Sequence, residues 1–337
     1  MNLSRRSLFV LPVLPAVLSA CQGGPRVLEV SGPTMGTTFN VVAVDPDARV
    51  ARADLVAAIN TALDEVNTHL SNWDTASEVS RLNRTASTTP ITVSPALSDV
   101  LAAADEVHRA SAGKFDITIG PLIELWGFGA ERMTTAMPEQ TAIDTVLAQS
   151  GQGGLRLDAG TVTKAHPETQ VFLSAIGKGY GVDRVARAVA DLGLSDFLVE
   201  IGGDLYASGH NAQGRDWQIG IEVPDASARR VQSVASVSGL GMATSGDYRN
   251  FFEVGGQRYS HILDPQTGRP ITHRTASATV LTDDAMRADA WATAMLILGR
   301  DRGLEVAEAE DLAVVFVEPS DTGFVTTASP RFTALQG

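Results

Sequence analysis

The chain has 337 residues, 44% of them hydrophobic, which is enough for a substantial core in one large or two average domains. Its 26 Lys and Arg against 39 Asp and Glu give a formal charge of −13, and such a surface repels phosphate backbones, which argues against nucleic-acid binding. The single cysteine, Cys21, excludes an internal disulfide, a thiolate metal site and cysteine-protease chemistry in the folded body. We therefore expect a globular protein that works with oxygen and nitrogen groups.

The first twenty residues are typical of an export signal. Arg5 and Arg6 precede an apolar run from Leu8 to Val17, and Leu18-Ser19-Ala20 stands directly before Cys21. The run is shorter than the roughly 20 residues that cross a bilayer, and prolines interrupt it, so residues 1–20 are interpreted as a removable signal peptide. Leu-Ser-Ala-Cys resembles the bacterial lipobox, which implies a lipid anchor at Cys21. An ordinary signal peptide with a free thiol is the alternative.

Removal of this segment takes the charge to −15, because it carries two arginines and no acidic residue. Arg5-Arg6 fits both a twin-arginine signal and an ordinary basic region, so the export route stays open. Residues 21–26 are expected to be a short tether and 27–337 a single domain. The body is predicted to face an extracytoplasmic compartment and to touch a membrane only through its lipid.

Secondary-structure signals follow one another in chain order. β-branched and aromatic residues at 27–44 predict two strands joined by a turn at Gly32-Pro33. Apolar residues at helical spacing predict a helix over 53–70. A second helix is indicated by Ser94 as N-cap, Pro95 in the first position and Gly113 as the stop signal.

The second half mixes both kinds of element. Helices are predicted at 183–192, after a glycine-rich start at Gly177, and at 284–298, capped by Asp283 or Asp284 and ended by Gly299. Strands are predicted at 197–201, 217–223, 231–237, 251–254 and 313–317. There is no regular β-α alternation and no internal repeat. The sequence therefore predicts one α+β domain with a mixed or antiparallel sheet and packed helices.

Asp289 and Thr293 are four residues apart in the last of these helices, so both oxygens project from one face. A carboxylate with a hydroxyl, and no sulfur or histidine nearby, suits a hard cation such as Mg²⁺. A solvated helix face is the commoner explanation of such a pair. The pair is therefore a candidate metal site.

Three glycines surround Lys178 in the segment 175–181, where a helix is predicted to begin. Backbone N–H groups at a helix start favour phosphate, and glycines allow it to approach the chain. The spacing is not that of a P-loop. A glycine-rich turn packed against a strand explains the segment about as well.

Other candidate groups lie in loops. His261, just before a Pro-containing turn, could act as a general base, although a structural histidine is the commoner case. The 241–248 stretch combines two hydroxyls with Asp247 and suits a phosphate or ribose, or is an ordinary polar turn. Trp73 and Phe115 stand among polar loop residues and could stack on a planar ring, with core or rim packing as the alternative.

Taken together, these segments resemble one family. In order they are Thr34-Met-Gly-Thr-Thr, Leu70-Ser-Asn-Trp-Asp, Gly113-Lys-Phe-Asp-Ile-Thr-Ile-Gly with Leu125-Trp-Gly-Phe-Gly, Ala175-Ile-Gly-Lys-Gly-Tyr-Gly, Glu200-Ile-Gly-Gly-Asp, Ala243-Thr-Ser-Gly-Asp-Tyr, His261-Ile-Leu-Asp-Pro and Ala288-Asp-Ala-Trp-Ala-Thr-Ala. They resemble the ApbE family of FAD:protein FMN transferases, periplasmic lipoproteins that attach FMN from FAD to a threonine of a flavoprotein. The resemblance spans about Gly32 to Gly299 and implies a T-fold-related α+β domain.

The resemblance also implies site residues. FAD, the substrate, would be bound by Met35, Trp73, Lys114, Phe115, Asp116, Lys178 and Leu263, and Mg²⁺ by Asp289 and Thr293 with the carbonyls of Ala175 and Ala292. One position departs from the family pattern, because Phe172 stands where the family carries an aspartate. This departure predicts that a polar contact to the nucleotide is lost or rebuilt.

The implied reaction is attack of a partner's threonine hydroxyl on the FMN phosphorus, which releases AMP. Mg²⁺ and Lys178 would neutralise the phosphates, and His261 or Asp247 would take the proton. The partner is expected to be a threonine-bearing flavoprotein in the same compartment. Two alternatives remain open at this point: a metal-dependent FAD pyrophosphatase, and a lipoprotein that binds FAD without cleaving it.

Overall fold

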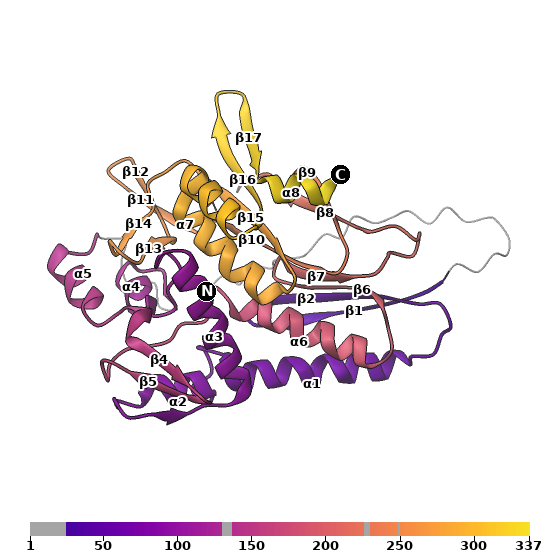
Figure 1. Cartoon of the computed structure of the whole chain (residues 1–337), viewed down its shortest axis with the longest axis horizontal. Coiled ribbons are helices and arrows are strands. Elements are labelled where there is room, and N and C mark those ends of the chain that lie inside the picture. Colours follow the sequence, from indigo (N-terminus) through magenta and orange to yellow (C-terminus); the bar gives the residue numbers. More distant parts are fainter. Residues whose placement is uncertain (1–24, 130–136, 226–229, 249) are drawn as a thin grey trace, which may run out of the picture.

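An eight-stranded antiparallel sheet runs through the molecule in the order β1-β2-β6-β7-β10-β15-β16-β17 (Figure 1). The computed structural model describes residues 25–129, 137–225, 230–248 and 250–337. The strands of this sheet are β1 (Arg26–Thr34), β2 (Thr37–Asp45), β6 (Asp196–Ile201), β7 (Asp204–Ser208), β10 (Leu240–Gly246), β15 (Ser277–Thr282), β16 (Ala313–Ser320) and β17 (Gly323–Ala328).

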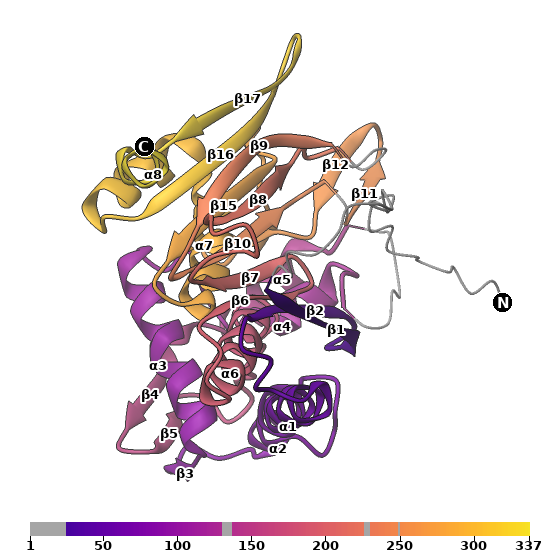
Figure 2. The same cartoon turned by 90° about the vertical axis from the view of Figure 1, so that its right-hand side faces the viewer.

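Helices cover one face of the sheet, as Figure 2 shows for α1, α3 and α6. The helices on this face are α1 (Arg52–Leu70), α2 (Glu78–Arg84), α3 (Pro95–Ala110), α6 (Gly177–Asp191) and α7 (Ala285–Ala309). The hairpin of β8 (Trp217–Glu222) and β9 (Val231–Val237), together with α8 (Pro330–Gln336), packs on the other face. The period of two along β6 explains this layering, since Phe197 and Val199 pack toward α1 and α6 while Leu198 packs toward β8.

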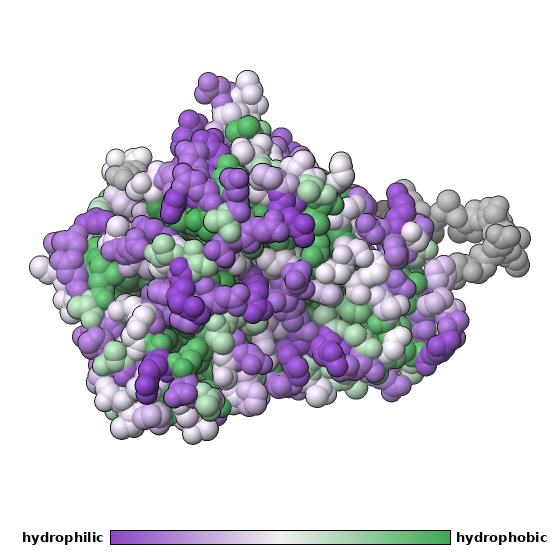
Figure 3. Space-filling model, viewed as in Figure 1, coloured by the Kyte–Doolittle hydropathy of each residue, from purple (hydrophilic) through white to green (hydrophobic). Residues whose placement is uncertain are grey.

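Smaller elements gather at one end of the molecule, beside α4 (Gly120–Leu125) and α5 (Gln140–Leu147). They are a three-stranded sheet of β3 (Ile91–Thr92), β5 (Thr161–Lys164) and β4 (Leu155–Asp158), the short helix η1 (Gln152–Gly154), and the two-stranded pairs β11 (Phe251–Val254) with β12 (Gln257–Ser260) and β13 (Leu263–Asp264) with β14 (Arg269–Pro270). The space-filling view shows a mostly hydrophilic face with separated apolar areas, in keeping with the acidic composition (Figure 3).

The first turn lies later than the sequence predicts. β1 and β2 are joined at Met35-Gly36, whose φ angles of 47° and 72° are those of a two-residue hairpin turn. Pro33 lies inside β1, which is an edge strand and therefore tolerates a residue without an N–H group. β1 also includes Arg26, the last residue of the predicted tether.

The helix ends follow the capping signals closely. The Ser94 side chain accepts a hydrogen bond from Leu97 N, and that of Asp284 accepts one from Arg287 N. Gly299 interrupts α7 with φ 73° and ψ 171°, but a second helical stretch follows to Ala309, so the prediction of a helix end there is only partly right. A Cβ at Gly299 would lie 3.0 Å from the His273 ring, which favours glycine at this break.

The expected fold class, one α+β domain with an antiparallel sheet and packed helices, is confirmed. The predicted signal peptide and Cys21 lie outside the described residues. Within the described residues, no helix combines the length and the apolar character needed to span a bilayer.

Candidate active site

Lys178 joins two buried carboxylates. It is the second residue of α6, and its Nζ contacts Oδ2 of Asp204, at the start of β7, and lies 3.4 Å from Oδ1 of Asp289 on α7. The other oxygen of Asp289 accepts a hydrogen bond of 3.0 Å from Gly179 N. Only 2% of Asp204 and 3% of Asp289 are exposed, so solvent screens this cluster weakly.

The cluster carries more negative than positive charge. Burial alone lowers the pKa of Lys178, but the carboxylates of Asp204 and Asp289 outweigh it, and the pKa lies above its ordinary value. Burial, followed by the charge of Asp289, raises the pKa of Asp204 to about 7. Two carboxylates share one ammonium group, so the cluster is suited to binding a further cation.

Glycines allow the three elements to meet. A Cβ on Gly179 would lie 2.2 Å from the Ala285 carbonyl oxygen, so α6 and α7 can cross here only because this residue is glycine. Gly202 has φ 61° in the turn before Asp204, and its Cβ would meet the Thr37 side chain at 2.8 Å. Of the three glycines around Lys178, Gly179 thus serves helix packing, whereas a Cβ on Gly181 would meet Met35 at 3.1 Å and Ile201 of β6 at 3.5 Å.

Hydroxyl groups border the carboxylate cluster. Thr293 lies one turn after Asp289 on α7, and its Oγ1 is 3.0 Å from Oγ of Ser245 on β10. Ala175 lines the same cavity. Carboxylate, hydroxyl and carbonyl oxygens are the donors that Mg²⁺ prefers, and the surplus negative charge beside them also fits a cation. Among the described residues no three His, Cys, Asp or Glu side chains form a metal-binding group.

Two cavities meet at Lys178. The inner cavity has a volume of about 290 Å³, and the outer one, on the side of α1, about 200 Å³. Both are lined by Phe172, Ser174 and Lys178. The predicted site residues on the inner cavity are Phe115, Asp116, Ala175, Lys178, His261, Leu263, Asp289 and Thr293, and those on the outer cavity are Met35, Trp73 and Lys178. A ligand with two ring systems joined by a charged linker fits this arrangement.

His261 is oriented by a backbone hydrogen bond. Its Nδ1 lies 2.9 Å from the Asn250 carbonyl oxygen, so Nδ1 donates and Nε2 keeps a free lone pair in the neutral ring. Phe128 packs edge-on against the imidazole at 6.2 Å. Burial lowers the pKa of His261, and this effect exceeds the opposing contributions of Asn250 O and Asp247. The imidazole is therefore neutral near pH 7 and can accept a proton.

Asp247, the second candidate base, is held in an ion pair. Its Oδ2 accepts a hydrogen bond of 2.6 Å from Arg258, whose guanidinium also lies 4.3 Å from the centre of the Phe251 ring. Asp247 is 7% exposed and is not among the residues lining either cavity. The structure therefore favours a role in fastening the β11–β12 hairpin.

Of the remaining predicted residues, Asp116 lines the inner cavity, whereas Lys114 and Ala292 line neither cavity. Lys114 is ion-paired with Asp264 at 2.8 Å and lines neither cavity. The carboxylate of Asp116 accepts hydrogen bonds from Thr118 and from Gln152 N, so it shapes the loop that forms the cavity wall. Ala292 is fully buried inside α7 and lines neither cavity.

Two polar groups of the site were not singled out from the sequence. The local signal for Asp204 is the Gly202-Gly203 turn, after which its side chain contacts Lys178 on α6. Ser245, which the sequence predicts to lie in a loop, is instead part of strand β10 and pairs with Ala278 of β15. Their importance depends on partners 26 and 48 residues away, Lys178 and Thr293 respectively, which no local pattern reveals.

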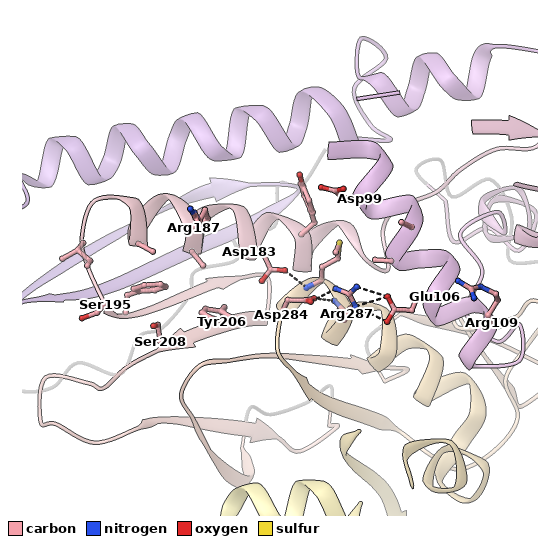
Figure 4. Close-up of a pocket in the computed structure, with 18 residues that line it drawn as sticks. Asp99, Glu106, Arg109, Asp183, Arg187, Ser195, Tyr206, Ser208, Asp284 and Arg287 are labelled. Atoms are coloured by element: carbon pink, nitrogen blue, oxygen red, sulfur yellow. Dashed lines mark hydrogen bonds and ion pairs between the residues drawn. The ribbon is translucent and has the colours of Figure 1, made fainter. Parts of the chain in front are cut away.

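A hollow of about 910 Å³ lies elsewhere, between α3, α6 and the start of α7 (Figure 4). Its charged groups largely neutralise each other, as Arg287 binds both Glu106, at 2.8 Å, and Asp284, at 2.7 Å. Asp183 accepts hydrogen bonds from the first N–H groups of α7. None of the predicted site residues lines this hollow, so the candidate active site is the pair of cavities at Lys178.

Comparison with known proteins identifies the class to which this fold and site belong. Residues 35–316 match the model of the ApbE family, and the chain belongs to this family. It is 41% identical over 325 residues to a Haemophilus influenzae protein named FAD:protein FMN transferase, with 94% of each chain covered. A Vibrio cholerae protein of the same name is 39% identical over 316 residues, covering 94% of this chain and 95% of that protein.

Comparison with solved structures leads to the same family. The flavin transferase ApbE from Vibrio cholerae superposes with a TM-score of 0.85 at 38% identity, covering 92% of this chain and 99% of that one. The apo form of the Pseudomonas stutzeri flavinyl transferase ApbE gives a TM-score of 0.86 at 36% identity, covering 94% and 99%. Fold and family therefore agree over nearly the whole chain.

Proposed function

We propose that this protein transfers FMN from FAD to a threonine hydroxyl of a partner flavoprotein and releases AMP. The observation that carries the proposal is the position of Lys178, whose ammonium group lies where two cavities meet, beside the oxygen cluster of Asp289 and Thr293. Membership of the ApbE family makes the chain a transferase with FAD as its substrate. The identity of the acceptor residue and the metal dependence belong to our proposal.

FAD would extend past Phe172 into both cavities, and its pyrophosphate would lie beside Lys178. The flavin is assigned to the outer cavity, because the Trp73 side chain, which is 62% exposed, offers a stacking surface there. The adenylate, which leaves as a small molecule, is assigned to the inner cavity between Phe115 and Leu263.

Asp289 and Thr293, with the Ala175 carbonyl, are the residues that would hold Mg²⁺. When bound there, the ion would supply Lewis-acid stabilisation of the phosphate oxygens. Lys178 would stabilise the charge that develops on the oxygen bridging the two phosphates. The surplus negative charge of the cluster supports this assignment, since a pyrophosphate is otherwise repelled by Asp204 and Asp289.

His261 is assigned as the general base. Its free Nε2 would take the proton from the threonine hydroxyl as the oxygen bonds to the FMN phosphorus. The bond from that phosphorus to the bridging oxygen breaks, and the electron pair leaves on AMP. One phosphoester forms and one phosphoanhydride breaks, so the reaction needs no oxidant or further co-reactant.

The test uses the whole mature chain with FAD and Mg²⁺, with and without a protein that carries an exposed threonine. Covalent FMN on the acceptor, measured by intact-protein mass, together with an equal amount of AMP, is the expected result. FMN release without any labelled acceptor would instead indicate a pyrophosphatase. Bound FAD that survives unchanged would indicate a binding protein.

For the cellular location, we propose export and lipid attachment at Cys21, on the periplasmic face of a bacterial membrane. The support is the sequence alone, namely the apolar run and the Leu-Ser-Ala-Cys segment. Metabolic labelling with a fatty acid should mark the wild-type chain and not Cys21→Ser. Equal labelling of both would contradict the anchor.

A further inference from the structure

The backbone on both sides of Phe172 is held by two asparagine side chains. Asn72 donates to Val171 O at 2.8 Å and accepts from Leu173 N at 2.8 Å. Asn83 donates to Val171 O at 2.8 Å and accepts from Val171 N at 2.7 Å. Four side-chain hydrogen bonds thus fasten an irregular segment that lies outside any helix or strand.

The Phe172 side chain has little freedom to retreat. Its own N–H donates to Ile117 O at 2.7 Å, and a Cβ placed on Gly120 would lie only 3.0 Å from the Phe172 Cβ. The ring meets Trp73 edge-to-face, with centroids 6.0 Å apart and an interplanar angle of 82°. Trp73 directly follows Asn72 in the chain, so the residue that anchors the backbone beside Phe172 is next to the second ring.

This aromatic pair lies beside Lys178, where the proposed function places the pyrophosphate of FAD. Phe172 lines both cavities together with Lys178, so its ring lies at the point where the two halves of FAD would join. A phenyl ring offers water no hydrogen-bond acceptor or donor, and water is the nucleophile that competes with a threonine hydroxyl. A half-buried apolar ring at this point lowers the occupancy of water near the phosphorus.

We propose that Phe172, positioned by Asn72 and Asn83, determines the choice of acceptor by excluding water, so that FMN is transferred rather than hydrolysed. The inference rests on the proposed function and deepens it. In the competing reaction the oxygen of water bonds to the FMN phosphorus, the bond to the bridging oxygen breaks, and the proton passes to His261. The products are then free FMN and AMP.

The test compares Phe172→Asp, Phe172→Ala and Phe172→Leu in the full mature chain with FAD, Mg²⁺ and a saturating threonine-bearing acceptor. The ratio of free FMN to acceptor-bound FMN is measured by chromatography and intact-protein mass. Phe172→Asp and Phe172→Ala should raise this ratio about tenfold or more, and Phe172→Leu should stay near the wild-type value because it remains apolar. Phe332→Ala on α8 is the control for truncating a half-buried phenylalanine away from both cavities.

A second measurement does not depend on turnover. Iodide quenching of the fluorescence of FAD bound to metal-free protein should increase in Phe172→Ala and not in Phe172→Leu. An unchanged product ratio and unchanged quenching in Phe172→Asp and Phe172→Ala would overturn the inference. So would a wild-type chain that already hydrolyses FAD as fast as these variants. A wild-type chain that binds FAD without cleaving it would refute the proposed function instead, and the quenching result would still decide whether Phe172 shields the bound flavin from solvent.

Discussion

Nζ of Lys178 lies 3.4 Å from Oδ1 of Asp289, although 111 residues separate the two in the chain. The two side chains meet because α6 and α7 cross. An ammonium group from one helix and a candidate metal ligand from the other therefore line the same cavity. We expect the loss of the Asp289 carboxylate and the loss of the Lys178 ammonium group to affect catalysis and stability differently.

Asp289→Ala should abolish metal-dependent cleavage of FAD while the fold remains. We expect a loss of about a thousandfold in kcat, since a metal ion contributes several kcal/mol to the transition state. The melting temperature should stay within a few degrees of the wild type, because repulsion with Asp204 disappears together with the contact to Lys178. Asp283→Ala, an exposed acidic residue just before α7, is the matched control. Full activity of Asp289→Ala would refute the metal site.

Lys178→Met should destabilise the protein as well as inactivate it. Two buried carboxylates then lack their cation, which costs about 2–3 kcal/mol of unfolding free energy, somewhat less than for a fully buried pair because Lys178 is partly exposed. Adding Asp204→Asn should restore most of the stability and none of the activity. Denaturant unfolding of the single and double variants measures both effects. A double variant no more stable than Lys178→Met would contradict the charge argument.

His261→Ala should lower kcat/KM at pH 7 by about a hundredfold or more, the usual size of a general-base effect. The base acts in its neutral form, so wild-type kcat/KM should fall as the pH drops through an apparent pKa below the ordinary value of about 6.5. That acidic limb should be missing in the variant. Asp247→Asn should keep the limb. A loss smaller than about tenfold would remove His261 from the mechanism.

Glu78→Gln should reduce stability in a pH-dependent way. The Glu78 carboxylate accepts hydrogen bonds from Ser94 N and Ser94 Oγ and lies 2.6 Å from His69 Nδ1. Burial alone raises the pKa of Glu78, but these hydrogen bonds outweigh it and hold the pKa below its ordinary value. A lowered pKa means that the stabilisation is present above about pH 4.5 and is lost as the pH falls through the folded-state value.

The expected loss in Glu78→Gln at pH 7 is about 2 kcal/mol, typical of hydrogen bonds to a charged group. The difference from the wild type should shrink below pH 4.5. Urea unfolding at pH 7 and at pH 3.5–4 measures it, with the exposed Glu308→Gln as control. A difference that stays constant with pH would show that the charge of Glu78 is irrelevant.

Gly179→Ala should separate the two helices that carry the site. Its Cβ would lie 2.2 Å from the Ala285 carbonyl oxygen, whereas a Cβ at Gly177 meets nothing closer than 3.8 Å. We expect a loss of about 3 kcal/mol for Gly179→Ala and little change for Gly177→Ala. Thermal unfolding of the two variants checks this. Equal stabilities would contradict the close crossing of α6 and α7.

Local signals predicted much of the secondary structure. Ser94 and Asp284 cap their helices as expected, because an N-cap bonds to N–H groups two or three residues ahead in the same chain. The Met35-Gly36 turn was missed, since Gly32-Pro33 offers an equally strong local turn signal and only pairing with β2 decides between them. The break at Gly299 was found, but not the helix beyond it.

For the site, the sequence by itself determined which residues are chemically able to act: Lys178 in a glycine-rich segment, Asp289 with Thr293 at helical spacing, and His261 beside a turn. Only the tertiary structure decided which of them meet. In the folded chain Asp204 forms an ion pair with Lys178, and Asp247 forms one with Arg258. Phe172 lines both cavities. The physical reason is that spacing along a chain specifies the face of one helix or strand, whereas charge pairing and exclusion of water depend on which elements pack together.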